Sequence, residues 1–223
     1  MNYCAMKLSF VRLVFFAMLL SLRCSQAAVY QESGGRVVIE AEHFDSRTTN
    51  ASGHAFLIVP TEDPGAGPVP FINARGDMYI QILPDNGGPG GANIDPLVRF
   101  RVNIGTVGTY QLYLRWGGFD GGSDSVYAGL VGFTDGTGGT VADWYRYART
   151  LTANSDFNGG WHGAAGFERT DAGGNDVAAT WVISSPGLYT IQLSQREDGA
   201  SVDALSFQLS TLPAPTDPGP PES

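Results

Sequence analysis

A two-residue alternation of apolar and polar side chains recurs along this chain and restricts it to folds built from strands. Eight segments carry the alternation, and turn-forming stretches such as "PDNGGPGG", "FDGGSD" and "TDGTGG" separate them. Many short strands with such turns predict an all-β protein, an antiparallel β-sandwich, over residues 28–210. The predicted strands span residues 36–44, 78–83, 97–104, 110–116, 125–133, 179–184, 188–195 and 201–209.

The first 27 residues have the features of a secretory signal peptide. Lys7 and Arg12 precede the ten-residue apolar run "LVFFAMLLSL", and small residues lead up to Ala27. The run is too short to span a bilayer, which needs about 20 apolar residues. We therefore expect cleavage after Ala27 and a secreted protein, extracellular or periplasmic. An uncleaved signal anchor is the alternative.

Cleavage after Ala27 changes the composition of the chain. Both cysteines, Cys4 and Cys24, lie in the signal segment, so the mature chain has neither a disulfide nor a thiol. Cleavage also removes three of the 13 basic residues, which leaves ten basic and 22 acidic residues and a net charge of about −12. Such a surface repels nucleic acid and anionic membranes and attracts cations. We expect a monomer that binds no nucleic acid and does not insert into a membrane.

The last 13 residues, 211–223, read "TLPAPTDPGPPES". Proline has no backbone N–H, so a segment this rich in proline cannot supply a ladder of hydrogen-bond donors. The composition predicts an extended linker or stalk after the domain.

Three carboxylates occupy positions where an alternating strand should place apolar side chains. Asp203 falls on the apolar face of the last strand, and Glu40 and Glu42 fall together on one face of the first strand. A buried carboxylate needs a charged or hydrogen-bonded partner. One Ca²⁺ ion could collect all three if the first and last strands lie side by side, because calcium accepts several oxygen ligands in flexible geometry. The alternative is that Arg196 neutralises Asp203 while both glutamates reach solvent.

Trp161 is the first candidate for binding a ligand. Sugars stack on exposed aromatic rings, and neighbouring polar groups fix their hydroxyls. The segment "NSDFNGGWHGAAG" surrounds Trp161 and His162 with loop formers and offers no apolar alternation for the ring to join. Trp116 and Trp181, in contrast, alternate in phase with apolar neighbours, so we expect both in the core.

A second candidate group lies in the segment "GGFDGGSDS". It consists of Phe119, Asp120 and Asp124. An aromatic ring beside carboxylates suits a sugar, but turn formation explains the two aspartates equally well.

Several of these segments resemble known modules. In chain order, "VVIEAEHF", "GTYQLYLRW" and "GLYTIQLSQREDGASVDALSF" resemble the β-sandwich of family 6 and family 35 carbohydrate-binding modules. The segment "SDSVYAGL" and the closing "REDG" followed by Asp203 are most similar to the domain at the C-terminus of glycoside hydrolase family 115 enzymes. The resemblance covers roughly residues 36–209.

The resemblance implies a jelly-roll fold of the galactose-binding-domain type and a polysaccharide or cell-surface glycan as ligand. It implies a structural calcium on Glu40, Glu42 and Asp203, and it implies Trp161, in "GGW", as the stacking ring. The chain departs from the family pattern at residues 199–201, "GAS", where those modules often carry an asparagine that binds sugar. It departs again at His162, where a second tryptophan often stands.

Two other functions remain open at this point. An extracellular structural or adhesive domain of the same fold would bind a protein partner instead of a glycan. An enzyme is the third possibility, but the sequence contains no nucleophile-elbow, zinc-type histidine or phosphate-loop motif. We therefore expect a non-catalytic binding module.

Overall fold

A computed structural model describes residues 29–65, 71–88, 90–132, 144–148, 156–157, 160–163, 169–171, 173–175 and 177–223. The predicted signal peptide, residues 1–27, lies outside these ranges. Within them, no helix has the length and apolar character needed to cross a membrane.

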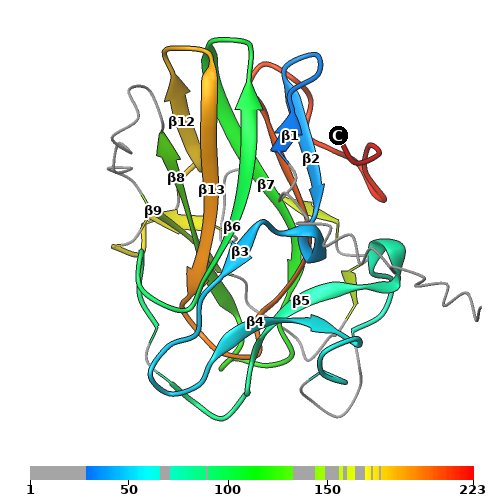
Figure 1. Cartoon of the computed structure of the whole chain (residues 1–223), viewed down its shortest axis with the longest axis vertical. Coiled ribbons are helices and arrows are strands. Elements are labelled where there is room, and N and C mark those ends of the chain that lie inside the picture. The colour runs from blue at the N-terminus through cyan, green and yellow to red at the C-terminus, as the bar shows by residue number, and fades with distance from the viewer. Residues whose placement is uncertain are drawn as a thin grey trace, which may run out of the picture.

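Two β-sheets form a sandwich, as the alternation predicts (Figure 1). In the first sheet the order is β1-β6-β13-β8-β9-β11, and β3 also pairs with β6. The strands of this sheet are β1 (Val29–Gln31), β3 (Ser46–Arg47), β6 (Leu97–Ile104), β8 (Ser125–Gly132), β9 (Trp144–Ala148), β11 (Arg169–Asp171) and β13 (Gly187–Gln195). Among these strands β1 and β6 run parallel, and the other pairs are antiparallel.

The second sheet carries the candidate site. Its order is β10-β7-β14-β5-β4, with β12 also beside β7 and β2 also beside β14, all antiparallel. Its strands are β2 (Arg36–Glu40), β4 (Ala55–Val59), β5 (Tyr79–Leu83), β7 (Gly108–Gly117), β10 (Trp161–His162), β12 (Thr180–Ile183) and β14 (Ser201–Leu209). The first and last strands predicted from the sequence, β2 and β14, are therefore direct neighbours, as the calcium prediction requires.

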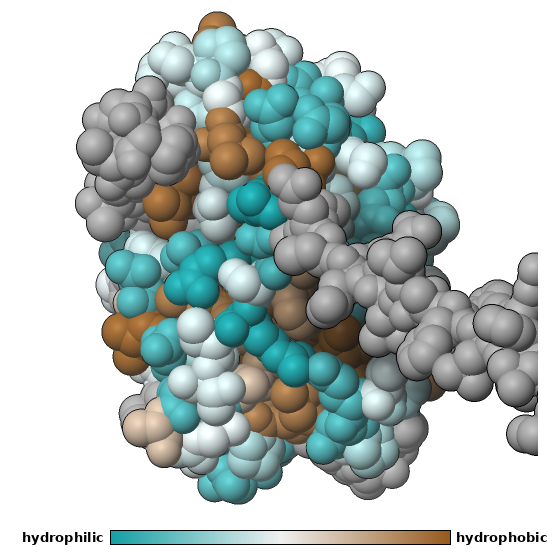
Figure 2. Space-filling view, in the orientation of Figure 1, coloured by the Kyte–Doolittle hydropathy of each residue, from teal (hydrophilic) through white to brown (hydrophobic). Residues whose placement is uncertain are grey.

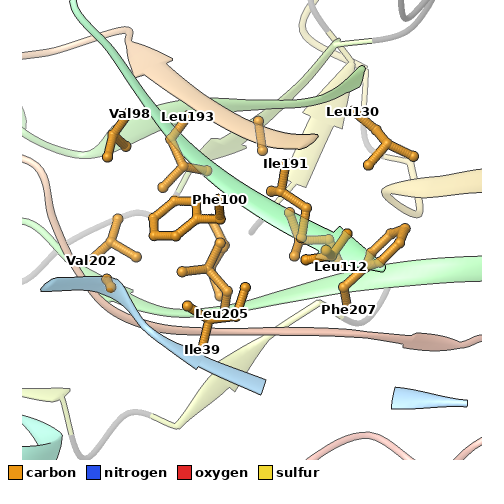
Figure 3. Packing of buried hydrophobic residues seen from close by; sticks show 14 of the residues in the cluster. Ile39, Val98, Phe100, Leu112, Leu130, Ile191, Leu193, Val202, Leu205 and Phe207 are labelled. Carbon is orange, nitrogen blue, oxygen red and sulfur yellow. The ribbon is translucent and has the colours of Figure 1, made fainter. Parts of the chain in front are cut away.

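The core lies between the two sheets (Figure 3). Phe100 and Leu193 of the first sheet meet Leu205 and Phe207 of the second, and all four are at most 1% exposed. Trp116 and Trp181 belong to the same cluster, so the prediction that both are core residues is confirmed. On the face seen in Figure 2, hydrophilic side chains are interspersed with smaller hydrophobic areas. Large hydrophobic side chains that are exposed within the described ranges are Ile72, Ile94, Val107 and Val182.

Two strands that begin alike in sequence also begin alike in structure. β7 and β13 each open with Gly-x-Tyr. The hydroxyl of Tyr110 donates a hydrogen bond to the Thr106 carbonyl at 3.0 Å, and that of Tyr189 donates to the Ser185 carbonyl at 2.6 Å. Each tyrosine thus reaches back four residues and closes the turn that precedes its own strand.

The first predicted strand is too long. β2 ends at Glu40, and residues Ala41–His43 form a single 3₁₀ turn, η1. The two-residue alternation stops where the turn begins, so Glu40 and Glu42 do not share a strand face. Val37, Ile39 and Ala41 belong to the core cluster, whereas Glu40 lies outside it.

Residues 211–223, for which the composition predicts a linker or stalk, lie along β2. The N–H of Ser223 donates to the Val38 carbonyl at 3.0 Å, and the N–H of Val38 donates to Ser223 Oγ at 2.9 Å. The N–H of Glu40 donates to Glu222 Oε1 at 3.0 Å. In Figure 1 the red C-terminal segment lies beside β2. The tail therefore covers the edge of β2 opposite β14.

A single carboxylate connects the β1–β2 turn to the β6–β7 turn. Glu32 Oε2 accepts hydrogen bonds from the N–H groups of Gly105 and Thr106, at 2.8 and 2.7 Å. Glu32 Oε1 accepts from the Gly35 N–H at 2.6 Å and from the Thr106 hydroxyl at 3.1 Å. Burial opposes ionisation of Glu32, but these donors hold the pKa of the carboxyl below its ordinary value.

We expect Glu32→Gln to destabilise the fold by about 1 kcal/mol at pH 7, because an amide cannot replace a carboxylate that accepts from several donors. A carboxylate with a lowered folded pKa stabilises the protein above its unfolded pKa, about 4.5, and this stabilisation is lost as the pH falls through the folded value. Urea unfolding at pH 7, 5, 4 and 3 should show the same difference from wild type at pH 7 and 5, and a smaller difference at pH 4 and 3. A difference that is constant with pH would contradict the role of the charge.

Candidate functional site

Asp203 occupies an irregularity in β14. Val202 pairs with Trp116 of β7 and Ala204 pairs with Arg115, so Asp203 is an extra residue in a β-bulge. A bulge re-aims a side chain relative to the strand alternation. The prediction that Asp203 points with the apolar set of β14 is therefore wrong. Its carboxylate meets Arg115, which lies between two core residues of β7 and so faces the outer side of the sheet.

The carboxylate of Asp203 is fully buried and bound by two donors. Arg115 Nη1 lies 2.5 Å from Asp203 Oδ2, and the backbone N–H of Arg75 donates to Oδ1 at 2.7 Å. Burial raises the pKa of Asp203 to about 6, although Arg115 pulls it down. The alternative partner Arg196 pairs with Glu197 instead, so that prediction is wrong.

Arg75 connects the last strand to the first. Its backbone binds Asp203, while its Nη2 atom lies 2.7 Å from Glu40 Oε1. Arg75 belongs to the 3₁₀ turn η2 (Arg75–Asp77) that precedes β5. Burial raises the pKa of Glu40, and the Arg75 guanidinium opposes that rise. One arginine thus bridges two of the three predicted calcium ligands.

Glu42 is the least compensated of the three carboxylates. It is 7% exposed, and its Oε2 atom is buried with no hydrogen-bond partner among the described residues. Burial, together with the nearby charges of Glu40 and Asp203, raises the pKa of Glu42 to about 7. The charges of the three carboxylates therefore influence one another.

The fit of calcium to these residues is partial. Carboxylate oxygens suit a hard cation, and the Oε2 atoms of Glu40 and Glu42 are both buried without a partner. Both oxygens of Asp203, however, already accept hydrogen bonds from arginine. No group of three or more His, Cys, Asp or Glu side chains in the described ranges is arranged to hold a metal ion. The calcium remains a prediction, and the two glutamates are its best-suited ligands.

Trp161 lies beside this charged cluster on the outer side of the second sheet. It opens β10 and pairs with Arg115 of β7. The Arg75 guanidinium stands over the indole, with Cζ 5.8 Å from the ring centroid. The indole is half-buried, and its Nε1 atom has no hydrogen-bond partner among the described residues. The loop residue singled out for stacking is thus placed at a polar, arginine-lined surface.

The structure separates His162 from the surface around Trp161. Successive residues of a strand point to opposite faces, and His162 is 4% exposed and packs edge-on against Trp116 at 6.4 Å. Its ring is therefore beside the core, where a ligand stacked on Trp161 does not meet it.

The second candidate group forms a turn after β7. Asp120 Oδ1 accepts hydrogen bonds from the Gly122 N–H at 2.8 Å and the Ser123 hydroxyl at 3.2 Å. The N–H of Asp124 donates to Glu197 Oε2 at 2.8 Å. Phe119 is half-buried and packs against a small apolar cluster that includes Phe71 and Phe157. Turn formation and packing therefore account for these residues.

Sequence reasoning missed the two arginines that organise the site. The sequence pattern could have identified Arg115. It is the one charged residue within the alternating stretch "YQLYLRW", and it stands in the polar phase between two core residues. No sequence pattern distinguishes Arg75, which lies in the loop segment "NARGD". Asp217 was also missed. It accepts a hydrogen bond from Arg115 Nε at 2.8 Å, and its side chain is 35% exposed.

Comparison with known proteins adds little to this structural description. No protein-family model and no curated protein matches the chain. The chain is similar to a solved GH26-CBM35 β-(1,4)-mannanase from Podospora anserina, with 15% identity and a TM-score of 0.45 over 85% of this chain and 31% of that one. It is similar to a ruminal GH26 endo-β-1,4-mannanase with 14% identity and a TM-score of 0.39, over 82% and 27%. The chain therefore spans less than a third of either enzyme, and these similarities identify no family.

Asp203→Ala should lower the free energy of unfolding by about 3–5 kcal/mol, because it leaves the Arg115 guanidinium buried without its main counter-charge. Asp217→Ala is the matched control. It removes a partner of the same arginine that is partly exposed, and should cost about 1 kcal/mol or less. Chemical denaturation of the three proteins measures both values. Equal losses for the two variants would mean that the buried pair has no special role.

Proposed function

We propose that the mature chain is a secreted, non-catalytic carbohydrate-binding module that stacks a sugar ring of a polysaccharide or cell-surface glycan on Trp161. The placement of the indole carries this proposal. Trp161 lies on the outer side of the second sheet, next to two N–H donors that have no partner among the described residues, its own Nε1 and Arg75 Nη1. Sugars need an aromatic face and a few polar groups in this arrangement.

The buried carboxylates support a binding role over a hydrolytic one. Glycoside hydrolysis commonly uses two carboxyl groups, about 5–10 Å apart, that flank the scissile bond in a cleft. Here Glu40 and Asp203 are each held by an arginine, and Asp203 is fully buried. A substrate bond cannot reach the fully buried carboxylate of Asp203, so we assign Asp203 to the architecture of the site.

Trp161→Ala should weaken retention on a bound polysaccharide at least ten-fold, which corresponds to about 1.4 kcal/mol of lost stacking. The assay is a pull-down of the mature chain with a panel of insoluble cellulose, xylan and mannan, together with a glycan array. Phe119→Ala is the matched control, because it removes a half-buried ring from the other candidate group. Melting curves establish that both variants stay folded. Retention that is lost in Phe119→Ala but not in Trp161→Ala would move the site to the second group.

We also propose calcium as the structural cofactor of this module, held by Glu40 and Glu42. Their unpartnered Oε2 atoms support the proposal, since a divalent cation would neutralise carboxylates that Arg75 compensates only in part. The ion would join η1 to the second sheet near Asp203.

Calcium at 100 times its dissociation constant should stabilise the fold by about 2.7 kcal/mol. The measurement is the melting temperature in millimolar calcium and in excess chelator. Glu42→Gln should abolish the difference, whereas Glu62→Gln, which alters a carboxylate paired with Arg47 elsewhere, should leave it intact. A melting temperature that is indifferent to calcium in the wild type would rule out this cofactor.

One observation favours the alternative of a structural or adhesive domain with a protein partner. The outer edge of β2 binds an extended segment, the tail, through backbone groups at Val38 and Glu40. Sheet edges recognise extended peptides in this way. If the folded protein is retained on none of the glycans in the panel, the result would favour this second function.

A further inference from the structure

The tail, residues 211–223, is held to the domain at a few separate points. Asp217 binds Arg115, and the Pro220 carbonyl accepts a hydrogen bond from Arg75 Nη2 at 2.9 Å. Nearer the end, Glu222 lies 3.0 Å from His43 Nδ1. The tail thus meets Arg115 with the Asp217 carboxylate and Arg75 with a backbone carbonyl, and Glu222 pairs with His43.

Between these points the tail crosses the Trp161 ring. Gly219 has a φ of +100°, and a Cβ atom added there would lie 2.5 Å from Trp161 Cζ2 and 2.9 Å from Arg75 Nη1. The backbone of Gly219 therefore lies directly against the indole and the guanidinium. Only glycine accommodates both this conformation and this contact. The ring proposed to stack a sugar is covered by the chain itself.

The cover can form few backbone hydrogen bonds with β2. Five of the 13 tail residues are proline, so few N–H groups remain to pair with β2. Two hollows of about 390 Å³ each remain beside the tail: one is lined by Arg36, Val38 and tail residues, the other by Arg36 and residues 213–220. Glu222 pairs with His43, whose side chain is 49% exposed, so solvent weakens this ion pair.

The covered surface also contains polar groups that the tail does not satisfy. Trp161 Nε1 and Arg75 Nη1 are buried without a hydrogen-bond partner among the described residues. Burying an N–H group that makes no hydrogen bond is unfavourable. A ligand with acceptor oxygens could satisfy both donors once the tail moves away, so the closed arrangement is not the best available partner for this surface.

We propose that residues 211–223 form a strap that masks Trp161 and competes with the ligand for the surface formed by Trp161, Arg75 and Arg115. The masking follows from the contacts of the tail alone. The competition with a ligand rests on the proposed function. Binding then requires that the strap be displaced, and substitutions that loosen the strap strengthen binding.

Solute quenching of tryptophan fluorescence tests the masking without any glycan. Trp116, Trp144 and Trp181 are at most 9% exposed, so acrylamide quenching should report mainly on Trp161, with Trp161→Phe giving the background. Gly219→Val in the mature chain should raise the quenching constant at least two-fold, because its side chain cannot fit against the indole. The double variant Asp217→Ala/Glu222→Ala should do the same by removing two anchors. Ala214→Val, at an exposed tail position, is the matched control.

Quenching that is unchanged in both strap variants overturns the proposal, whatever the glycan result. The same proteins are then tested for retention on insoluble xylan and mannan. Stronger retention by Gly219→Val and by the double variant, by at least three-fold over wild type and Ala214→Val, supports competition. Equal retention overturns the competition. Raised quenching with no retention by any of the proteins supports the strap and counts against the proposed function, so the two failures are distinguishable.

Discussion

The buried ion pair between Asp203 and Arg115 is the interaction on which the rest of the second sheet depends. Two charges held this far from water are tolerated only while both partners stay in place. The bulge in β14 turns Asp203 outward, and Arg75 satisfies its second oxygen from the turn before β5. Because Arg75 also binds Glu40, it adds a side-chain link to the direct backbone pairing of the first strand with the last.

The charges around this pair do not balance. Glu40, Glu42 and Asp203 carry three potential negative charges, and Arg75 and Arg115 carry two positive ones. The remaining carboxylate is buried, which explains why the pKa of Glu42 rises to about 7. A proton on Glu42 would restore neutrality. The tail adds Asp217 and Glu222 to the same region. Asp217 pairs with Arg115, and Glu222 pairs with His43.

The alternation of side chains was a reliable guide where strands are regular. It gave β6 and β14 with their observed bounds and placed Trp116 in the core. It failed where the backbone departs from two residues per repeat, at the bulge of Asp203 and the 3₁₀ turn of Glu42. An alternation carries no sign of an extra residue. It therefore flagged Asp203 as buried but placed its side chain on the wrong face.

The path of the tail could not be read from composition for a different reason. Many prolines establish that a segment cannot form a ladder, but they do not say whether isolated side chains will find partners. Here the outer edge of β2 and the ring of Trp161 both need cover, since an open strand edge invites pairing with other chains. A proline-rich segment satisfies the edge only at Val38 and Glu40 and covers the ring with Gly219. The tail therefore covers both surfaces at once.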